Sequence, residues 1–323
     1  MPLLSVRDLK MFYQVERGFV KAVNDVTFDL NRGEALGIAG ESGCGKSSLA
    51  LTILRILPPN ARIMGGSILL EGQDLLKMNE EILRKEVRWK RISIIFQGAM
   101  NALNPVFKVG DQIAEAILLH ENISKDEALN RARELLKLVG ISPSRADNYP
   151  HEFSGGMRQR VMIAMALACN PDIVIADEPT TALDVIVQAQ ILKLLKDLRS
   201  KLNLSLILIT HDLSIISEIC DKVAIMYAGK IVEYGSTHEI FKNPLHPYTQ
   251  GLISAIPSIR GPKRQLQSIP GTPPDLLNPP PGCPFHPRCP YADNTCKSKI
   301  PPVISLGRSR YVMCHKIEEV NER

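Results

Sequence analysis

The chain has 323 residues, 45% of them hydrophobic and 23% charged, which is an ordinary globular composition and leaves room for a large core and perhaps two units. The formal net charge of +5 is not gathered in a dense Lys/Arg block, so composition gives little support for a nucleic-acid-binding protein. No apolar run approaches the roughly 20 residues that a membrane span needs, and the N-terminal segment lacks a signal-peptide pattern, so we expect a cytoplasmic chain without spans.

The first part of the chain predicts strands followed by a phosphate-binding loop. Alternating residues within residues 1–34, as in Val26–Leu30, predict β-strands. The apolar run Ala35–Ala39 predicts a buried strand, and residues 48–54 predict the start of a helix. Between them, Gly40–Ser47 fits the pattern G-x-x-x-x-G-K-[ST] of a P-loop, in the strand–loop–helix context that this motif requires.

A P-loop binds phosphate mainly through its backbone, because its glycines let N–H groups point inward and the helix N-terminus adds partial positive charge. We expect Lys46 to bring a full charge to the outer phosphates and Ser47 to bind Mg2+ through its hydroxyl. Cys44 lies where a helix N-terminus can lower a thiol pKa, but a small loop residue is the simpler interpretation. The nucleotide-binding candidates here are Gly40, Ser42, Gly43, Cys44, Gly45, Lys46, Ser47 and Ser48.

Further along, predicted strands and helices alternate. The predicted strands are residues 91–97, 171–176 and 205–210, and the predicted helices are residues 111–139, 157–169 and 185–202. This alternation predicts an α/β core with a mostly parallel sheet. The stretch over residues 106–170 lacks strand signals, which predicts an inserted helical subdomain.

Two carboxylates, Asp177 and Glu178, end the apolar run Ile173–Ala176. A P-loop protein needs a carboxylate at such a strand end to hold Mg2+ and its waters, and we expect Asp177 to be that residue. Glu178 is then able to polarise the attacking water. Without the P-loop upstream, a solvated acidic turn would be the better interpretation.

A second glycine-rich loop, Phe153–Gln159, precedes the helix predicted near residue 157. Its Ser-Gly-Gly sequence stands at a helix N-terminus, where anions bind. Taken alone, Ser-Gly-Gly is also a common loop sequence. The position of this loop after the P-loop and before the acidic strand end is what favours a second anion site.

Taken in order, these motifs resemble the ATP-binding subunits of ABC transporters over about residues 3–256. The motifs in this order are GESGCGKS, Gln97, SGGMRQR, IVIADEP, TALD and His211. In that family the signature loop of one subunit caps the ATP held by the P-loop of another, which implies that this chain works as a dimer. The signature loop departs from the usual L-S-G-G-Q at Phe153 and Met157, which bears on how firmly the dimer closes.

The resemblance also implies roles for single residues. Tyr13 would stack on adenine, with Phe12 as the rival, and the segment Thr181–Asp184 resembles the D-loop at the dimer interface. Gln97 would contact Mg2+ or water, and His211 would touch the γ-phosphate. The candidate catalytic residues are Lys46, Gln97, Glu178 and His211, the candidate Mg2+ ligands are Ser47 and Gln97, and the nucleotide-binding candidates outside the P-loop are Tyr13, Gln97, Ser154, Gly155, Gly156, Gln159, Asp177 and Asp184.

After about residue 256, recurrent prolines exclude long regular elements. The four cysteines of this segment are Cys283, Cys289, Cys296 and Cys314. Their spacing is not the C-x2-C of common zinc sites, yet four thiolates in a short Pro-rich segment predict a metal that replaces a core. Zinc and an iron–sulfur cluster both suit four cysteines, and disulfides or unlinked thiols are alternatives. His286 and His315 are possible substitute ligands.

This segment in turn resembles the oligopeptide, dipeptide and nickel importer ATPases over about residues 240–316. The matching stretches are His246–Thr249, Pro270–Pro274, Gly282–Phe285 and Arg288–Pro290. Some members of that group carry a [4Fe-4S] cluster here. The resemblance therefore favours such a cluster over zinc on the four cysteines, with a structural role as the default.

The resemblance implies a P-loop NTPase with a RecA-like α/β core, an N-terminal antiparallel β subdomain and the inserted helical subdomain. We predict a nucleotide-binding domain over residues 1–256 and a metal-binding C-terminal extension over residues 257–323. ATP, Mg2+ and the [4Fe-4S] cluster are the expected cofactors.

The predicted function is ATP hydrolysis that powers import of dipeptides or oligopeptides, with the chain attached peripherally to the cytoplasmic face of the membrane. The implied partners are two permease subunits, a second ATP-binding subunit and, indirectly, an extracytoplasmic peptide-binding protein, with no nucleic acid. The alternatives are an importer for nickel or another small solute, an ABC-type ATPase acting on nucleic acid or ribosomes, and a regulatory subunit that binds ATP without hydrolysing it.

Overall fold

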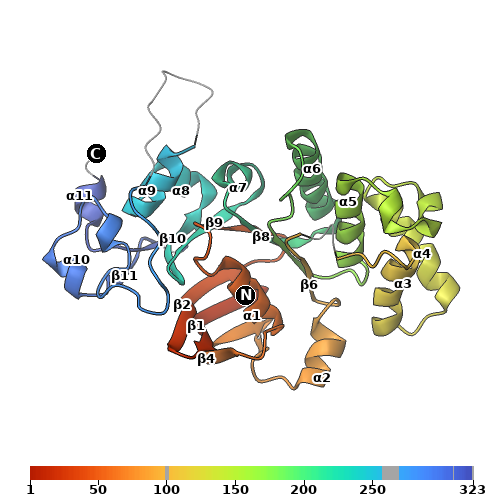
Figure 1. The fold of residues 1–323 in the computed structure, drawn as a ribbon, viewed down its shortest axis with the longest axis horizontal. Helices are drawn as coiled ribbons and strands as arrows, with labels where there is room; N and C mark the ends of the chain where they lie inside the picture. Colours follow the sequence, from red (N-terminus) through yellow and green to blue (C-terminus); the bar gives the residue numbers. More distant parts are fainter. Residues whose placement is uncertain (99–101, 257–268, 308, 322–323) are drawn as a thin grey trace. The chain divides into compact units, whose positions relative to one another are not determined.

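The computed structural model describes residues 1–98, 102–256, 269–307 and 309–321. The chain divides into two compact units, the first formed by Met1–Leu76 with Ile209–Arg323 and the second by Lys77–Leu208 (Figure 1). The first unit thus contains both the P-loop and the described part of the C-terminal extension. The boundary predicted after residue 256 therefore falls inside one compact unit, and it stays a prediction.

The first unit begins with a four-stranded antiparallel sheet in the order β2-β1-β4-β5. Its strands are β1 (Leu4–Val15), β2 (Gly18–Leu30), β4 (Ala61–Leu70) and β5 (Gln73–Asp74). Strand β1 pairs with β2 and with β4, and its side chains Val6, Leu9 and Met11 are fully buried. The strands predicted within residues 1–34 and the antiparallel β subdomain are confirmed.

A second sheet in this unit carries the P-loop, with the strand order β11-β12-β10-β9-β3. Its strands are β3 (Ala35–Ala39), β9 (Lys222–Tyr227), β10 (Lys230–Ser236), β11 (Val303–Ser305) and β12 (Tyr311–Met313). Strands β3 and β9 are parallel, and every residue of β3 is buried, which explains its continuous apolar sequence. Strand β12 pairs with β10, so the C-terminal extension adds two strands to this sheet.

The helices of the first unit are short, and the shortest lie in the extension, as the prolines there predict. They are α1 (Lys46–Leu54), α7 (Leu213–Ile219), α8 (Thr237–Lys242), α9 (Pro247–Ser254), the 3-10 helix η5 (His286–Arg288), α10 (Asn294–Ser298) and α11 (Ile317–Asn321). Helix α8 begins with a capping box between Ser236 and Glu239. None of the described elements of the extension is longer than five residues.

The second unit combines parallel strands with a group of helices. Its strands are β6 (Ile92–Ile95), β7 (Ile173–Asp177) and β8 (Ser205–Thr210), whose last two residues belong to the first unit, and its helical elements are α2 (Glu80–Ile82), η1 (Leu83–Val87), α3 (Val109–His120), α4 (Lys125–Leu138), η3 (Pro143–Asp147), η4 (Pro150–Glu152), α5 (Gly155–Ala166) and α6 (Val185–Leu202). Strands β6 and β7 pair in parallel, which confirms the α/β prediction. Helices α3, α4 and α5 pack together (Figure 1).

Residues 111–139, predicted as helical, form two helices, α3 and α4, with a short connection between them. Ser124 ends the connection by capping α4: its side chain accepts a hydrogen bond from the backbone N–H of Glu127, whose carboxylate bonds back to Ser124. Such a capping box starts a helix and so marks a break that apolar periodicity alone does not reveal. Between β6 and β7 the described residues form helices and turns without strands, as predicted.

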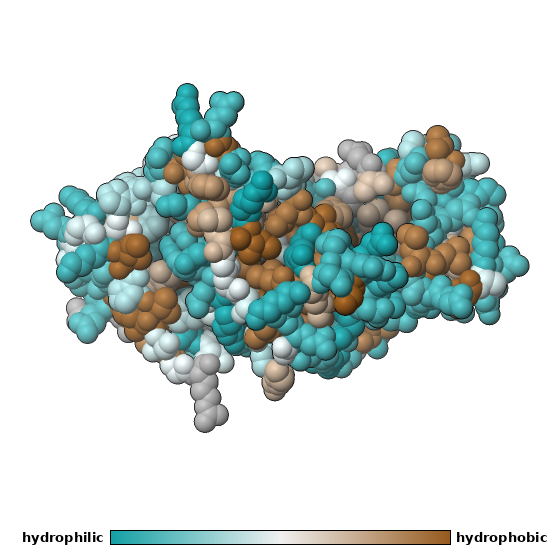
Figure 2. Space-filling model, turned by 90° about the horizontal axis from the view of Figure 1, so that it is seen from below, coloured by the Kyte–Doolittle hydropathy of each residue, from teal (hydrophilic) through white to brown (hydrophobic). Residues whose placement is uncertain are grey.

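Surface hydrophobicity is patchy on the face drawn in Figure 2, where brown apolar areas are separated by teal hydrophilic residues. Among the residues that the structure describes, no helix combines the length and the apolar character needed to cross a membrane. Large apolar side chains are nevertheless exposed in the second unit, including Phe107 on the connection before α3 and Val185 at the start of α6.

Candidate functional site

The P-loop conformation depends on glycine at two positions. Gly40 has φ 154° and Gly45 has φ 107°, a region that other residues rarely adopt. A Cβ on Gly40 would lie 2.1 Å from the carbonyl oxygen of Met226, and one on Gly45 would lie 2.0 Å from that of Ala22. The loop therefore packs tightly on the strands beneath it. Gly45 caps α1 without any side-chain hydrogen bond, so the first-turn N–H groups point to where an anion can bind.

Lys46 lies within the loop and is 6% exposed. Its Nζ donates hydrogen bonds to the carbonyl oxygens of Gly40, at 2.8 Å, and Glu41, at 3.0 Å. The ammonium is therefore already held at the mouth of the loop, where a phosphate would meet it. Burial raises the pKa of the Cys44 thiol despite the nearby Lys46 charge, so Cys44 is not an activated thiolate and the simpler interpretation holds.

Tyr13 reaches the same helix. Its hydroxyl lies 3.0 Å from Oγ of Ser48, the residue after the P-loop serine. Because successive side chains of a strand point to opposite faces, the neighbouring Phe12 is directed away from this contact. This geometry favours Tyr13 over Phe12 as the aromatic residue beside the nucleotide, although stacking on adenine stays a prediction.

In the second unit the structure brings Gln97 and Glu178 together. The Gln97 side-chain amide donates a hydrogen bond of 2.8 Å to the Glu178 carboxylate, and the Thr181 hydroxyl donates a second of 3.1 Å. Glu178 has φ 45°, an uncommon conformation for a non-glycine residue that often occurs at functional sites. The carboxylate is thus fixed by two side chains and a constrained backbone, as a group that orients water requires.

The signature loop forms the start of α5. Ser154 is its N-cap and accepts a hydrogen bond from the backbone N–H of Met157 at 3.4 Å. A Cβ on Gly156 would lie 2.5 Å from a methyl group of Val187 on α6, so glycine there permits the close approach of the two helices. Gln159 is only 4% exposed, so its side chain lies inside this unit rather than on the loop surface. Its assignment as a nucleotide-binding residue stays a prediction.

The remaining candidates lie at the ends of strands and helices. Asp177 is the last residue of β7 and is 5% exposed. Asp184 caps α6 by accepting a 2.9 Å hydrogen bond from the backbone N–H of Val187. His211 directly follows β8 and is exposed. By unit, the P-loop, Tyr13 and His211 belong to the first, and Gln97, Ser154, Asp177, Glu178 and Asp184 belong to the second.

All seven cysteines of the chain are free thiols in the structure, so the disulfide alternative is wrong. In the extension, neighbouring thiols help to raise the pKa of Cys283, Cys289 and Cys314. Burial is the main reason why the pKa of Cys289 rises to about 11 and that of Cys314 to about 12, and the neighbouring thiols raise both further. Within the described part of the chain, no three His, Cys, Asp or Glu side chains stand close enough to hold a single metal ion.

Motif reasoning missed a connection between the extension and the P-loop. Arg288, on η5, makes two hydrogen bonds to the carboxylate of Glu41 in the P-loop, and Tyr248 on α9 accepts the backbone N–H of Glu41. Both residues stand inside stretches that support the family resemblance, next to Cys289 and in the His-Pro-Tyr-Thr run. No local pattern signals such a contact, because 247 positions separate Arg288 from Glu41.

Two family descriptions match this sequence. Residues 23–181 match the ABC transporter family, and residues 232–296 match the family described as the oligopeptide/dipeptide transporter, C-terminal region. The first match includes the P-loop, the signature loop and the acidic strand end. The second includes Arg288 and three of the four cysteines of the extension.

Similar proteins cover nearly the whole chain. The oligopeptide transport ATP-binding protein OppD of Escherichia coli is 49% identical over 98% of this chain and 94% of its own length, and the dipeptide transport ATP-binding protein DppD of Bacillus subtilis is 48% identical over 97% and 94%. Among solved structures, the ATP-binding cassette MJ0796, a dimer in a post-hydrolysis state bound to ADP and Pi, has a TM-score of 0.64, 26% identity, and covers 72% of this chain and 98% of its own.

Proposed function

This chain belongs to the ABC transporter family of ATPases, with the C-terminal region of oligopeptide and dipeptide transporters, and we propose that it hydrolyses ATP to power the import of dipeptides or oligopeptides through a membrane permease. The observation that carries the proposal is the similarity to peptide-transport ATP-binding proteins over 98% of the chain. That similarity includes the extension as well as the nucleotide-binding part, so it concerns the peptide-importer group and not ABC ATPases in general.

For nucleotide binding, the P-loop backbone and Lys46 neutralise the phosphates, and Tyr13 stacks on adenine. The tight glycine-built loop and the free N–H groups at the start of α1 support the first role. Mg2+ requires oxygen donors, and Ser47, Gln97 and Asp177 supply a hydroxyl, an amide and a carboxylate of the kinds that it prefers. When bound, Mg2+ spreads the charge that develops on the transferred phosphoryl group.

For hydrolysis, we assign Glu178 to the attacking water, with Gln97 holding the carboxylate and His211 acting on the γ-phosphate. Glu178→Gln is expected to lower kcat for ATP hydrolysis by about 100-fold to 1000-fold, because it removes the water-orienting charge, while ATP affinity changes less than about threefold. Phosphate release and equilibrium binding of ATP measure the two effects separately. Glu115→Gln, on an exposed residue of α3, is the matched control.

Equal loss of binding and hydrolysis in Glu178→Gln would contradict this assignment. Hydrolysis by the wild-type chain would also exclude the alternative of a regulatory subunit that binds ATP without turning it over. Because the proposed active form is a dimer, the assay is run over a range of protein concentrations. The dimeric state of MJ0796 supports a dimer for this chain, in which the Ser154–Gly156 loop of each copy or of a second ATP-binding subunit caps the partner's nucleotide.

The proposed partners are two permease subunits and, on the other side of the membrane, a peptide-binding protein. As an ATP-hydrolysing subunit attached to that permease, the chain would work peripherally on the cytoplasmic face of the membrane. Uptake of a labelled dipeptide, a labelled oligopeptide and nickel is measured in cells that produce either the wild-type chain or Glu178→Gln. Loss of peptide uptake with nickel uptake intact is the expected result, and the reverse pattern would favour a nickel importer.

We further propose that the four cysteines of the extension hold a [4Fe-4S] cluster. The residue types fit, because all four cysteines are free thiols, and those of Cys283, Cys289 and Cys296 each raise the pKa of Cys314, although no single-ion site stands among the described residues. Zinc would draw four sulfurs around one ion at about 2.3 Å, whereas a four-iron cluster takes one thiolate per iron and accepts wider spacing. When bound, the cluster would add to the small core that Phe285, Val312 and Val320 give this segment.

The cluster is tested by the iron, acid-labile sulfide and zinc content of anaerobically purified chain. Four iron and four sulfide per chain, lost in Cys289→Ser, is the expected result. One zinc per chain, or no metal at all, would contradict it. The matched control is Cys220→Ser, which removes a thiol outside the extension and should leave the iron content unchanged.

A further inference from the structure

The extension contacts the P-loop through a forked ion pair. The two terminal nitrogens of Arg288 donate to the two carboxylate oxygens of Glu41, at 2.6 and 2.8 Å. A bidentate pair of this kind fixes both distance and orientation. The Arg288 side chain is 4% exposed and that of Glu41 is 26% exposed, so the contact is largely shielded from water and salt.

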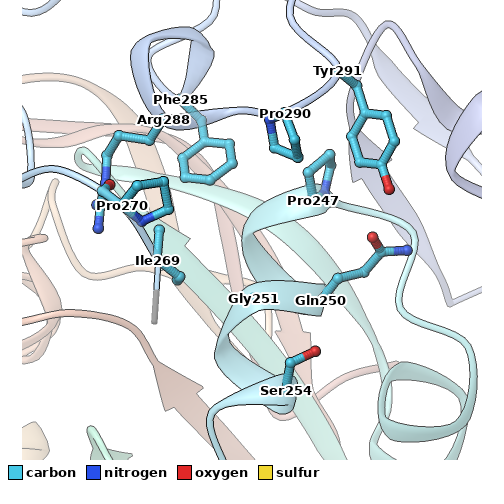
Figure 3. Close-up of a pocket in the computed structure, with 10 residues that line it drawn as sticks. All are labelled: Pro247, Gln250, Gly251, Ser254, Ile269, Pro270, Phe285, Arg288, Pro290 and Tyr291. Atoms are coloured by element: carbon cyan, nitrogen blue, oxygen red, sulfur yellow. The ribbon is translucent and has the colours of Figure 1, made fainter. Parts of the chain in front are cut away.

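Arg288 is itself held in place from several sides. Its Nε donates to the carbonyl oxygen of Pro270 at 2.7 Å, and its guanidinium lies 5.8 and 5.9 Å from the ring centres of Tyr227 and Phe285. Figure 3 shows Arg288 beside Pro270 and Phe285, at the edge of a cavity of about 200 Å3 between α9 and the extension. The guanidinium therefore reaches Glu41 with its orientation already fixed, provided that the extension is folded.

Glu41 forms hydrogen bonds through three of its groups. Its backbone N–H donates to the Tyr248 hydroxyl at 2.9 Å, its carbonyl oxygen accepts from Nζ of Lys46 at 3.0 Å, and its carboxylate accepts from Arg288. Glu41 is also the one carboxylate in the loop Gly40–Ser47, where Lys46 is the one cation. Unpaired, that carboxylate would cancel much of the charge that Lys46 offers and would repel the phosphates of ATP.

We propose that Arg288 is a positioning residue for nucleotide binding: it neutralises Glu41 and so keeps the P-loop attractive to ATP, which makes ATP affinity depend on the folded C-terminal extension. The proposal rests on the proposed function, since it concerns the same P-loop. It adds a regulatory role for the extension, because Arg288 directly precedes Cys289. Folding or unfolding of the segment that carries the four cysteines therefore changes the net charge that the P-loop presents to ATP.

The test is equilibrium binding of Mg2+ and the non-hydrolysable analogue AMP-PNP to the purified full chain, using a double-mutant cycle. Arg288→Gln removes the charge but keeps most of the side-chain stem, and it is expected to weaken binding about tenfold, more at low salt than at high salt. Adding Glu41→Gln to that variant removes the unpaired carboxylate. Binding is then expected to return to within about threefold of the wild type.

A matched control is Arg32→Ala, which removes an arginine from a pair with Glu71 in the same unit. It should leave AMP-PNP binding within about twofold. Circular dichroism and thermal unfolding establish that each variant is folded. Should Arg288→Gln unfold, Arg288→Lys replaces it, keeping the charge but losing the fork, and its affinity is expected to lie between those of the wild type and the double variant.

Two results would overturn the proposal. If Arg288→Gln binds AMP-PNP as the wild type does, the charge of Glu41 does not affect the nucleotide. If the double variant binds as weakly as Arg288→Gln, the arginine acts through packing only, and charge neutralisation is wrong. Failure of the wild-type chain to bind AMP-PNP would instead contradict the proposed ATPase function, so the two failures are distinguishable.

Discussion

The P-loop is shaped by backbone groups, whereas the C-terminal extension is held by side chains. In the P-loop, glycines at positive φ, carbonyl oxygens and helix N–H groups set the geometry, and Lys46 bonds to backbone carbonyls. In the extension, short elements are held by the packing of Phe285 against aromatic rings and by the hydrogen bonds of Arg288. The first region follows from local sequence, and the second depends on contacts between distant segments.

This difference predicts which kind of substitution destabilises each region. The P-loop should lose its conformation when a side chain is added at a position that has no room for it. It should tolerate the loss of a side-chain hydrogen bond. The extension, whose described helices and strands are at most five residues long, should be destabilised when one buried ring is removed, because short elements depend on side-chain packing for their stability. Three substitutions and one pH dependence, from the largest expected effect to the smallest, test this contrast.

Phe285→Ala should have the largest effect. The ring is 2% exposed and lies 5.2 Å from the ring centre of Tyr227 and 5.4 Å from that of Tyr248. Its removal is expected to cost about 3–5 kcal/mol of unfolding free energy, as for buried aromatic residues elsewhere. Urea unfolding measures the loss. The control is Val303→Ala, on a residue of β11 that is 58% exposed, which should lower the unfolding free energy by less than about 0.5 kcal/mol. Equal losses in both variants would show that the buried ring is not important for the extension.

Gly45→Ala should come next, because it adds a methyl group to the backbone-built loop. The substitution combines an unfavourable φ with a close contact to the Ala22 carbonyl, so about 2–4 kcal/mol of destabilisation and loss of ATP binding are expected. Gly307→Ala is the control, since Gly307 also has positive φ but meets no atom within 4 Å. The control should cost about 1 kcal/mol and keep ATP binding; similar thermal shifts for both would show that the close contact is unimportant.

His246, whose ring packs against Phe285 of the extension, should make the stability of the protein sensitive to acid. Burial lowers the pKa of His246 to about 3, below the value of about 6.5 in an unfolded chain. Between these values the unfolded state binds the proton and the folded state does not, so stability is lost as pH falls, by about 1.4 kcal/mol between about pH 7.5 and about pH 5.5. The measurement is urea unfolding at the two pH values.

The comparison variant is His246→Asn, which keeps an acceptor for the Tyr248 backbone N–H at the start of α9 and has no proton to gain. Its stability should change less with pH than that of the wild type. Glu233, which accepts the backbone N–H groups of Leu245 and His246, has a pKa raised mainly by burial and so favours the folded state as pH falls. That contribution is common to both proteins and cancels, so equal pH dependences would refute the assignment to His246.

Tyr13→Phe should have the smallest effect, because it removes one hydrogen bond, to Ser48, from the nucleotide region while keeping the ring. About 0.5–1.5 kcal/mol of stability is expected to be lost, with ATP affinity changed less than about twofold. Tyr13→Ala, which also removes the ring, should weaken ATP binding about tenfold if the ring stacks on adenine. Calorimetric titration with ATP measures both, and equal affinities in the two variants would argue against stacking.

Motifs with a local mechanism were predictable. The strand–loop–helix around Gly40–Ser47, the capped start of α5 and the strand ending in Asp177 each depend on neighbouring residues, and all three form where the sequence indicates. Apolar periodicity does not reveal the break between α3 and α4, but Ser124 followed three residues later by Glu127 is a capping-box pattern that the local sequence contains. The resemblance to peptide-importer ATPases also came from sequence alone.

Three features needed the tertiary structure. Gln97 and Glu178 were singled out separately, and only folding brings the amide to the carboxylate, across 81 positions. The pairing of β12 with β10 joins residues that are 77 and 79 positions apart, and the two hydrogen bonds between Arg288 and Glu41 span 247 positions. Local sequence determines which conformations the backbone adopts, because sterics and capping act over a few residues. Which distant side chains meet depends on how the whole chain packs, and here that packing places an arginine of the extension on the nucleotide-binding loop.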